Sequence, residues 1–419
     1  MRPDGTVVIV GAGQGGFQAA VSLRERGHTG PVVLIGDEPG LPYQRPPLSK
    51  GFLLREEGTI ELRARSFYER RRIELRHARV TAIDRPARQV RFADGNALAY
   101  DHLVLATGAR NRVPPIPGTG LDGIGQLRTR GDAERLRAGL SAVSRVAVIG
   151  AGFIGLEVAA AAVKTGAAVT VVESLDRPMA RSVSAVLSAH IAGLHRSYGT
   201  ELLLGRSVVR LHGSRDGTVE GAELDDGGFV RADLVVVGVS VSPATELAAD
   251  AGIDVGDGIR VDEFLRTCDP DISAIGDCAE FPGARTGARI RLESVQNAVD
   301  QARCLAARLT GAPTPYTALP WFWTEQFSTR LQIAGLGQGH DRTAVLGDPA
   351  TGSFSVLLFQ GDHLLSVESV NAPADHIAAR RVLASGTTPG PDEAAVEGFS
   401  LRDWADRQRR TDARVEVTG

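Results

Sequence analysis

A strand-like apolar segment that runs directly into a glycine-rich turn occurs twice in this 419-residue chain. The first copy is Val7–Val10 followed by Gly11–Gly16, with the spacing G-x-G-x-x-G. A helical pattern follows, and a second apolar strand, Val32–Ile35, ends near the acidic residues Asp37 and Glu38. This order of strand, glycine turn, helix, strand and acid is typical of a βαβ unit that binds a dinucleotide.

Each part of this unit has a physical reason. Glycines allow the tight turn and the close approach of backbone to a pyrophosphate, which binds at the N-terminus of the helix. The acid at the end of the second strand accepts hydrogen bonds from ribose hydroxyls. The residues expected in these roles are Gly11, Gly13, Gly15, Gly16 and one of the two acids.

The second copy begins at Val146–Ile149 and continues through Gly150–Gly155. A helix, the strand Val169–Val172 and then Glu173 complete it. A single glycine turn of this kind is weak evidence, because packing alone produces such turns in many α/β proteins. Two copies in the same context predict two dinucleotide sites, the second of them using Gly150, Gly152, Gly155 and Glu173.

The rest of the chain predicts an α/β fold of two nested dinucleotide-binding (Rossmann-like) domains, with a C-terminal α+β domain. Leu103–Leu105 and Leu234–Val237 are further buried strands, and Ser294–Leu309 is a long amphipathic helix. After Trp321, short alternating strands and the helix Ala374–Ala384 follow. The expected domains are 1–112 and 242–320 for the first dinucleotide, 113–241 for the second, and 321–419 for the C-terminal domain with its charged tail.

Composition excludes several other classes. The chain is 43% hydrophobic and 23% charged with a net charge of −3, so no global basic field points to nucleic acid or an anionic membrane. No apolar run reaches the about 18 residues of a membrane span, and the segment before Val7 leaves no room for a signal peptide. Three cysteines fit neither a disulfide scaffold nor a zinc-ligand spacing. We therefore expect a cytoplasmic protein without a metal site.

Further motifs carry a resemblance to a known family. The segment Thr267–Asp277 looks like the closing motif of glutathione-reductase-type flavoproteins, whose aspartate bonds the ribityl chain of FAD. Four more segments, Leu41–Lys50, Leu127–Thr129, Glu293–Asn297 and Pro320–Trp323, narrow the resemblance to the ferredoxin reductases of the putidaredoxin reductase and rhodocoxin reductase type. That family passes electrons from NADH through FAD to a small iron–sulfur ferredoxin.

The resemblance implies a set of site residues. Asp37, rather than Glu38, is chosen by alignment of the motif, since spacing alone does not separate the two. The backbone N–H groups at Val295 are expected to face the pyrimidine carbonyl of the flavin. Besides the glycines of the first turn, the residues expected against FAD are Asp37, Lys50, Val80, Arg128, Asp277 and Val295. The second glycine unit with Glu173 is expected to bind NADH.

Three residues are expected to take part in catalysis. Lys50 and Lys164 are the only lysines among 47 lysines and arginines, and Lys50 falls in the segment that resembles the flavin-contacting loop. Glu157 lies on the first turn of the second nucleotide helix among apolar neighbours, where it either caps the helix or meets a cation. Our hypothesis is an ion pair of Lys50 with Glu157 across the domain boundary, beside the flavin N5. Trp323 is expected beside the flavin, the alternative being a place in the core of the last domain.

Cysteines are missing where a thiol relay would stand. Disulfide reductases of this fold use two cysteines beside the flavin, and the segment Leu41–Gly51 has none. Electrons would then leave the flavin directly. We expect a two-iron two-sulfur ferredoxin as acceptor, serving a haem monooxygenase or a ring-hydroxylating dioxygenase. The alternatives are an NADH oxidase and a redox-sensing flavoprotein resembling apoptosis-inducing factor. A cluster of arginines is either a solvated face or a docking patch for an acidic ferredoxin: Arg63, Arg65, Arg70, Arg71 and Arg72.

Overall fold

The computed structural model describes residues 4–418 apart from 57 and 286, with the backbone alone described over 411–418. The chain forms two compact units, each built from separate stretches of sequence. The first contains residues 1–47, 58–110 and 241–318, and the second contains 48–57, 111–240 and 319–419. The segment 48–57, which we expected in the first dinucleotide domain, therefore belongs to the second unit.

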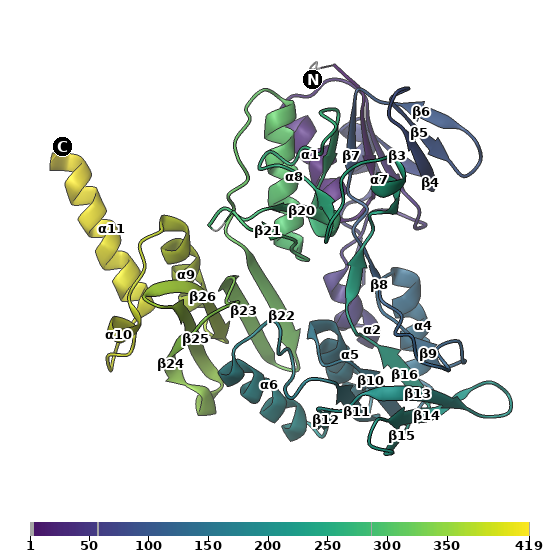
Figure 1. The fold of residues 1–419 in the computed structure, drawn as a ribbon, viewed down its shortest axis with the longest axis vertical. Helices are drawn as coiled ribbons and strands as arrows, with labels where there is room; N and C mark the ends of the chain where they lie inside the picture. The colour runs from purple at the N-terminus through teal and green to yellow at the C-terminus, as the bar shows by residue number, and fades with distance from the viewer. Residues whose placement is uncertain (1–3, 57, 286, 419) are drawn as a thin grey trace. The chain divides into compact units, whose positions relative to one another are not determined.

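A five-stranded parallel sheet forms the centre of the first unit (Figure 1). Every residue of the strands β1 and β7 is buried, which explains why they are apolar runs rather than alternating patterns. The register pairs Val7 with both Val32 and His102. The strand order is β19 (Ile272–Ala274), β7 (His102–Leu105), β1 (Val7–Val10), β2 (Val32–Gly36) and β3 (Ile73–His77).

Two helices of the first unit pack on each other. They are α1 (Gln14–Glu25), which follows the first glycine turn, and α8 (Val295–Leu309), whose N-cap Ser294 accepts a hydrogen bond from the N–H of Asn297. An antiparallel meander that we did not predict adds β4 (Val80–Asp84), β5 (Gln89–Phe92) and β6 (Ala97–Ala99). Smaller elements of this unit are α3 (Arg65–Arg70), α7 (Glu246–Asp250), β18 (Ile259–Arg260), β20 (Ala279–Pro282) and β21 (Arg289–Ile290).

The second unit repeats the parallel architecture. Its helix α5 (Phe153–Lys164) follows the second glycine turn and packs on the sheet. The strand order is β12 (Glu201–Leu204), β11 (Ala168–Glu173), β10 (Arg145–Ile149), β16 (Leu234–Val237) and β9 (Ile124–Gly125). Further elements are α2 (Gly51–Leu54), α4 (Arg130–Leu140), α6 (Ala185–Ser197), β13 (Val208–Gly213), β14 (Val219–Leu224) and β15 (Phe229–Arg231). The chain passes between the two units at the short strands β8 (Ala109–Asn111) and β17 (Val241–Pro243).

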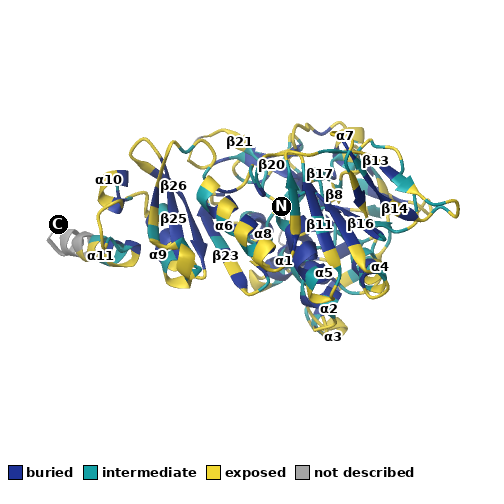
Figure 2. Cartoon of the chain, turned by 90° about the horizontal axis from the view of Figure 1, so that it is seen from below, coloured by how far each residue is buried: buried dark blue, intermediate teal, exposed yellow. Residues whose placement is uncertain are grey.

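The C-terminal part of the second unit is an antiparallel sheet with helices, as expected. Strands β25 and β26 are largely buried, and they are mostly dark blue in Figure 2. The strand order is β22 (Trp321–Gln326), β23 (Thr329–Gly335), β26 (His363–Val370), β25 (Ser353–Gln360) and β24 (Arg342–Asp348). The helices are α9 (Pro373–Ser385), α10 (Pro391–Ala394) and α11 (Leu401–Thr418).

Helix α6 is tied to this C-terminal sheet by buried polar groups. Glu368, which is 1% exposed, accepts hydrogen bonds from the N–H of Ser184 at 2.8 Å and from its hydroxyl at 2.6 Å. Burial raises the pKa of the Glu368 carboxyl. Near the other end of α6, Nε2 of His195 lies 2.9 Å from Oε1 of Gln326. The second glycine-turn half and the C-terminal sheet thus form one unit. Within the residues described, no helix combines the length and apolar character needed to cross a bilayer.

Candidate active site

The first glycine turn has two positions that only glycine can fill. Gly11 has φ +113°, and a Cβ there would lie 2.0 Å from the carbonyl oxygen of Ala106. A Cβ at Gly16 would lie 1.9 Å from the carbonyl oxygen of Gly11. A Cβ at Gly15 would make only ordinary contacts, the nearest at 3.6 Å, and one at Gly13 would meet nothing within 4 Å. The turn is therefore closed on the sheet side and open at Gly13, the N-cap of α1.

The second turn repeats this geometry. Gly150 has φ +101°, and its Cβ would lie 2.5 Å from the carbonyl oxygen of Gly238. A Cβ at Gly155 would lie 2.1 Å from the carbonyl oxygen of Gly150, whereas the space beside Gly152 is open. Gly152 is the N-cap of α5.

Both helix N-termini are suited to a phosphate group. In α1 and α5, as the structure describes them, no side chain caps the first turn and no acidic residue lies in it. Glu157, which we expected on the first turn of the second helix, lies beyond that turn. The first N–H groups of a helix have no intrahelical acceptor, and the helix dipole favours an anion there. Two open glycine N-caps with available donors fit the pyrophosphates of two dinucleotides.

The acids after β2 differ in their surroundings. The Glu38 carboxylate is held by Nη2 of Arg45 at 2.5 Å and by the hydroxyl of Tyr43. Asp37 is exposed to solvent. This difference supports Asp37 as the ribose ligand, which stays a prediction.

Glu173 after β11 is fixed by backbone donors. Its Oε2 accepts from the N–H of Ala151 at 2.7 Å, and its Oε1 accepts from the N–H of Leu175 at 2.9 Å. Arg177 donates instead to the carbonyl oxygens of Ala180 and Val183, at 2.8 and 2.9 Å. The acid is thus oriented beside the second glycine turn, while the nearest arginine in sequence is bound to backbone.

The remaining residues predicted for FAD fall in both units. In the first unit, Asp277 lies in the short turn Gly276–Cys278, which is anchored by the Gly276 N–H to Oε1 of Gln301 at 2.7 Å. Val295 begins α8, and Val80 begins β4 with 7% of its surface exposed. In the second unit, Arg128 precedes the N-cap of α4, and Lys50 precedes α2.

Lys50 and Glu157 form the ion pair that we predicted, with Nζ 2.8 Å from Oε2. The Glu157 side chain is 3% exposed and the Lys50 side chain 20%. Ser49 donates a hydrogen bond to the same Oε2, and Thr324 donates to Oε1 at 2.5 Å. Glu157 is therefore a buried carboxylate with several partners rather than a helix cap. Its expected location across a domain boundary is wrong, because both partners belong to the second unit.

The aromatic segment expected near the flavin forms the strand β22. Trp323 is half-buried, and its ring centroid lies 5.6 Å from that of Trp321. Trp321 in turn has the Arg380 guanidinium 4.5 Å above its ring and the His376 ring 5.6 Å away, edge-on. The place of Trp323 beside the flavin stays a prediction.

The three cysteines differ in their surroundings. Cys278 is fully buried, donates weakly to the carbonyl oxygen of Ile275 at 3.3 Å, and has its pKa raised by burial. Burial likewise raises the pKa of Cys304, whose Sγ lies 3.3 Å from the carbonyl oxygen of Thr314. Cys268 is exposed. Over the described part of the chain, no group of acidic, histidine and cysteine side chains is arranged to hold a metal.

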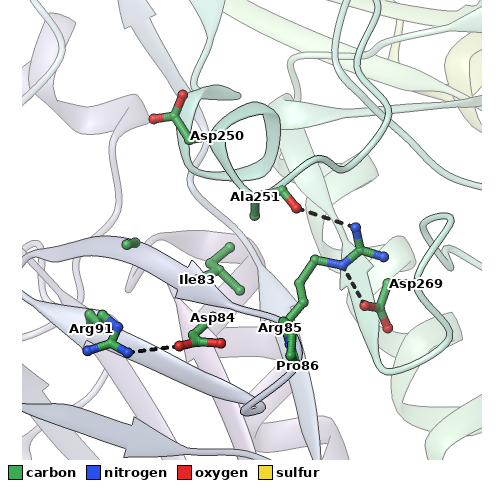
Figure 3. A pocket seen from close by; sticks show the side chains of 9 residues that line it. Ile83, Asp84, Arg85, Pro86, Arg91, Asp250, Ala251 and Asp269 are labelled. Carbon is green, nitrogen blue, oxygen red and sulfur yellow. Dashed lines mark hydrogen bonds and ion pairs between the residues drawn. The ribbon is translucent and has the colours of Figure 1, made fainter.

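A pocket of about 650 Å³ that the sequence did not indicate lies on the first unit (Figure 3). Four of the five charged residues that line it form two ion pairs. Arg85 Nε lies 2.8 Å from Asp269, and Arg91 Nη2 lies 2.8 Å from Asp84. We assign it no catalytic role.

The fold and the two glycine turns define a pyridine-nucleotide-dependent oxidoreductase with a second bound dinucleotide. The family described as pyridine nucleotide-disulphide oxidoreductase matches residues 5–302, and the family described as reductase C-terminal matches 321–405. The chain belongs to this oxidoreductase family and, within it, to the ferredoxin reductases. FAD is the bound cofactor of these proteins, and NADH is the co-substrate.

Relatives match over nearly the whole chain. Rhodocoxin reductase of Rhodococcus erythropolis is 50% identical over 400 residues, covering 95% of this chain and 93% of that protein. Putidaredoxin reductase CamA of Pseudomonas putida is 38% identical over 410 residues, covering 96% and 97%. The ferredoxin reductase for the CYP199A2 system from Rhodopseudomonas palustris has a TM-score of 0.93 at 45% identity, covering 96% and 99%. The covalent putidaredoxin reductase–putidaredoxin complex has a TM-score of 0.92 at 39% identity, covering 95% and 97%.

Proposed function

We propose that this protein is a cytoplasmic, NADH-dependent ferredoxin reductase that passes electrons through FAD to a two-iron two-sulfur ferredoxin. That ferredoxin would serve a haem monooxygenase or a ring-hydroxylating dioxygenase. The proposal is carried by one sequence match taken together with the missing cysteine of one segment. The chain matches a ferredoxin reductase over 95% of its length, and the segment Leu41–Gly51 has a lysine but no cysteine. Without a thiol beside the flavin, a disulfide is not the expected acceptor.

Most of the predicted site residues would bind the two dinucleotides. FAD, when bound, supplies the conversion of a two-electron hydride into single electrons. The open helix N-termini at Gly13 and Gly152 would hold the two pyrophosphates. Asp37 and Glu173 would accept hydrogen bonds from the adenosine riboses, and Asp277 from the polyol chain of the flavin.

The Lys50–Glu157 pair would serve the hydride step. The ammonium would place a positive charge where the reduced flavin gains negative charge, and the buried carboxylate of Glu157 holds the ammonium in position. Charge supports an acidic ferredoxin as the partner, because most arginines of the cluster are exposed and can face an acidic surface. The exposed ones are Arg63, Arg65, Arg70 and Arg72. Opposite charge on a partner raises the rate of encounter.

The test is NADH-driven reduction of cytochrome c by the FAD-loaded protein, with and without an added two-iron two-sulfur ferredoxin. Strong stimulation by the ferredoxin is the expected result. Formation of peroxide without stimulation would instead identify an NADH oxidase. Slow reduction together with a change of oligomeric state on adding NADH would identify a redox sensor.

A further inference from the structure

Helix α5 and strand β22 contact each other through two matched pairs of side chains within the second unit. Phe153 and Glu157 lie four residues apart on one face of the helix, and Phe322 and Thr324 lie two apart on one face of the strand. The Phe153 and Phe322 ring centroids are 4.6 Å apart. One helical turn further, the Thr324 hydroxyl donates to Glu157 Oε1 at 2.5 Å. The strand is therefore held on the helix at two points.

The opposite face of β22 carries the tryptophans. Since side chains alternate along a strand, Trp321 and Trp323 point away from α5. Trp321 is held there by Arg380 and His376 of α9, which lie one helical turn apart. The strand is thus fixed on both faces, and Thr324 is the direct chain neighbour of Trp323.

The two oxygens of Glu157 serve two different segments. Oε2 binds Lys50 and Ser49, which belong to segment 48–57, while Oε1 binds Thr324 of β22. Thr324 is 1% exposed and the Glu157 side chain 3%, so water does not compete freely for these contacts. One buried carboxylate therefore joins the lysine-bearing segment to the tryptophan-bearing strand.

We propose that Thr324 is a positioning residue for electron transfer. Its hydroxyl fixes the rotation of the Glu157 carboxylate, which in turn fixes the Lys50 ammonium. The same bond sets the register of β22 on α5, and thereby the position of Trp323 on the opposite face of the strand. The lysine-bearing segment and the tryptophan-bearing strand, both of which we expect beside the flavin, are thereby held together. This inference rests on the proposed function. A carboxylate oxygen that loses a buried donor is left unsatisfied, and the side chain is expected to turn toward another donor.

Three variants separate this role from simple packing. Thr324→Val keeps the shape of the side chain and removes the hydroxyl, whereas Thr324→Ser keeps the hydroxyl and removes a methyl group. The matched control is Ser366→Ala, which removes a fully buried hydroxyl from β26 of the same sheet. Ser366 donates to the carbonyl oxygen of Ala334 at 2.8 Å. Each variant is prepared as the full-length, FAD-loaded protein.

Reduction of FAD by NADH is followed by stopped flow, alongside steady-state turnover with ferricyanide, the flavin midpoint potential and the melting temperature. For Thr324→Val we expect about a tenfold slower reduction, which corresponds to about 1.4 kcal/mol of barrier. The kcat of this variant should fall with little change in KM for NADH, and its flavin midpoint potential should differ from that of the wild-type protein. Thr324→Ser should recover most of the rate. Ser366→Ala should change only the melting temperature.

Wild-type reduction rates and potential in Thr324→Val, with a lower melting temperature alone, would overturn the assignment. If the valine variant does not load FAD, Thr324→Ala replaces it with the same expectations. Failure of both to load FAD, while Ser366→Ala loads normally, would show that Thr324 is structural. None of these assays needs a ferredoxin, so a wild-type protein that reduces ferricyanide but not ferredoxin would refute the proposed function separately.

Discussion

The Nζ atom of Lys50 lies 2.8 Å from the Oε2 atom of Glu157, a carboxylate whose side chain is only 3% exposed. A buried ion pair is not in itself strongly stabilising, but removal of one partner leaves the other charge uncompensated, commonly at a cost of about 3–5 kcal/mol. Such a pair is therefore sensitive to any change of charge, and this makes it accessible to experiment.

Replacement of Lys50 by methionine should slow the reduction of FAD by NADH at least about tenfold and lower the midpoint potential of the flavin, because it removes the positive charge that we propose lies near the reduced ring. Lys50→Arg should restore only part of the rate, since the planar guanidinium does not reproduce the geometry of an ammonium. Lys164→Met is the matched control, because Lys164 is the other lysine of the chain and is exposed on the last turn of α5. Stopped-flow reduction of Lys50→Met at the wild-type rate, with an unchanged potential, would show the pair to be structural.

Coenzyme preference should follow Glu173. We expect its fixed carboxylate to accept hydrogen bonds from the ribose hydroxyls and to repel a 2′-phosphate, and hydrogen bonds to charged groups contribute about 1.5–3 kcal/mol. We expect kcat/KM for NADH to exceed that for NADPH by about ten- to a hundredfold, since each 1.36 kcal/mol is tenfold. Glu173→Gln should narrow the ratio mainly by weakening NADH. Arg177→Ala should not reverse it, because that guanidinium binds the carbonyl oxygens of Ala180 and Val183. Equal kcat/KM values in the wild-type protein would contradict this prediction.

Simultaneous replacement of Cys268, Cys278 and Cys304 by small residues should leave ferredoxin-coupled turnover nearly intact, because in the proposed mechanism no thiol carries electrons. The melting temperature should fall, mainly through the fully buried Cys278. The single Cys278→Ala variant measures how much of the fall in melting temperature comes from this residue alone. Direct electron transfer would have to be abandoned if the folded triple variant lost turnover while NADH still reduced its flavin normally.

His376 should make stability depend on acidity. Burial, with the charges of Arg380 and Arg330, lowers its pKa from 6.5 to about 4, and neither ring nitrogen has a hydrogen-bond partner within the described part of the chain. Between these two values the unfolded chain binds a proton that the folded protein does not, so the free energy of unfolding should fall as pH drops from about 6.5 to about 4. His376→Leu should flatten this slope in urea unfolding, whereas His363→Leu, at an exposed site, should not. Parallel slopes in wild type and His376→Leu would argue against the shifted pKa.

The arginine cluster should control encounter with the ferredoxin. Charge reversal at Arg65 and Arg70, both exposed, should raise KM for the ferredoxin several-fold and weaken its dependence on salt, with little effect on reduction of ferricyanide. Arg215→Glu, on an exposed turn of the second unit, is the control for net charge. An unchanged KM in the Arg65→Glu, Arg70→Glu variant would assign the cluster to a solvated face.

Much of the fold could be predicted because two of its buried strands, β1 and β10, end at glycine positions where the backbone conformation allows no other residue. Gly11 and Gly150 have positive φ and no room for a Cβ, so sequence and geometry coincide there. The strand β22 was not predicted, since three consecutive aromatics show no alternation of apolar and polar residues. The meander β4 to β6 was also missed, because its strands of 5, 4 and 3 residues are too short for a clear pattern.

The candidate site could be predicted in part. Lys50 and Glu157 were paired from their chemistry, because a rare lysine and an acid among apolar neighbours each need a partner. Thr324 was missed, since a threonine hydroxyl carries no signal in sequence and its acceptor is 167 positions away. The assignment of 48–57 to the second unit could not be read from the sequence either, because contacts and not chain order decide it.

The family descriptions divide the chain near residue 320, as though the C-terminal sheet were a removable module. The buried bonds of Glu157, Ser184 and His195 to that sheet indicate otherwise. A chain truncated at this point would lose three partners at once. These are Glu368, which accepts from Ser184 before α6, Gln326, whose amide lies beside His195, and Thr324, which donates to Glu157. Evolutionary loss or exchange of the domain would therefore require compensating changes in the nucleotide-binding half, so the two parts are expected to be inherited together.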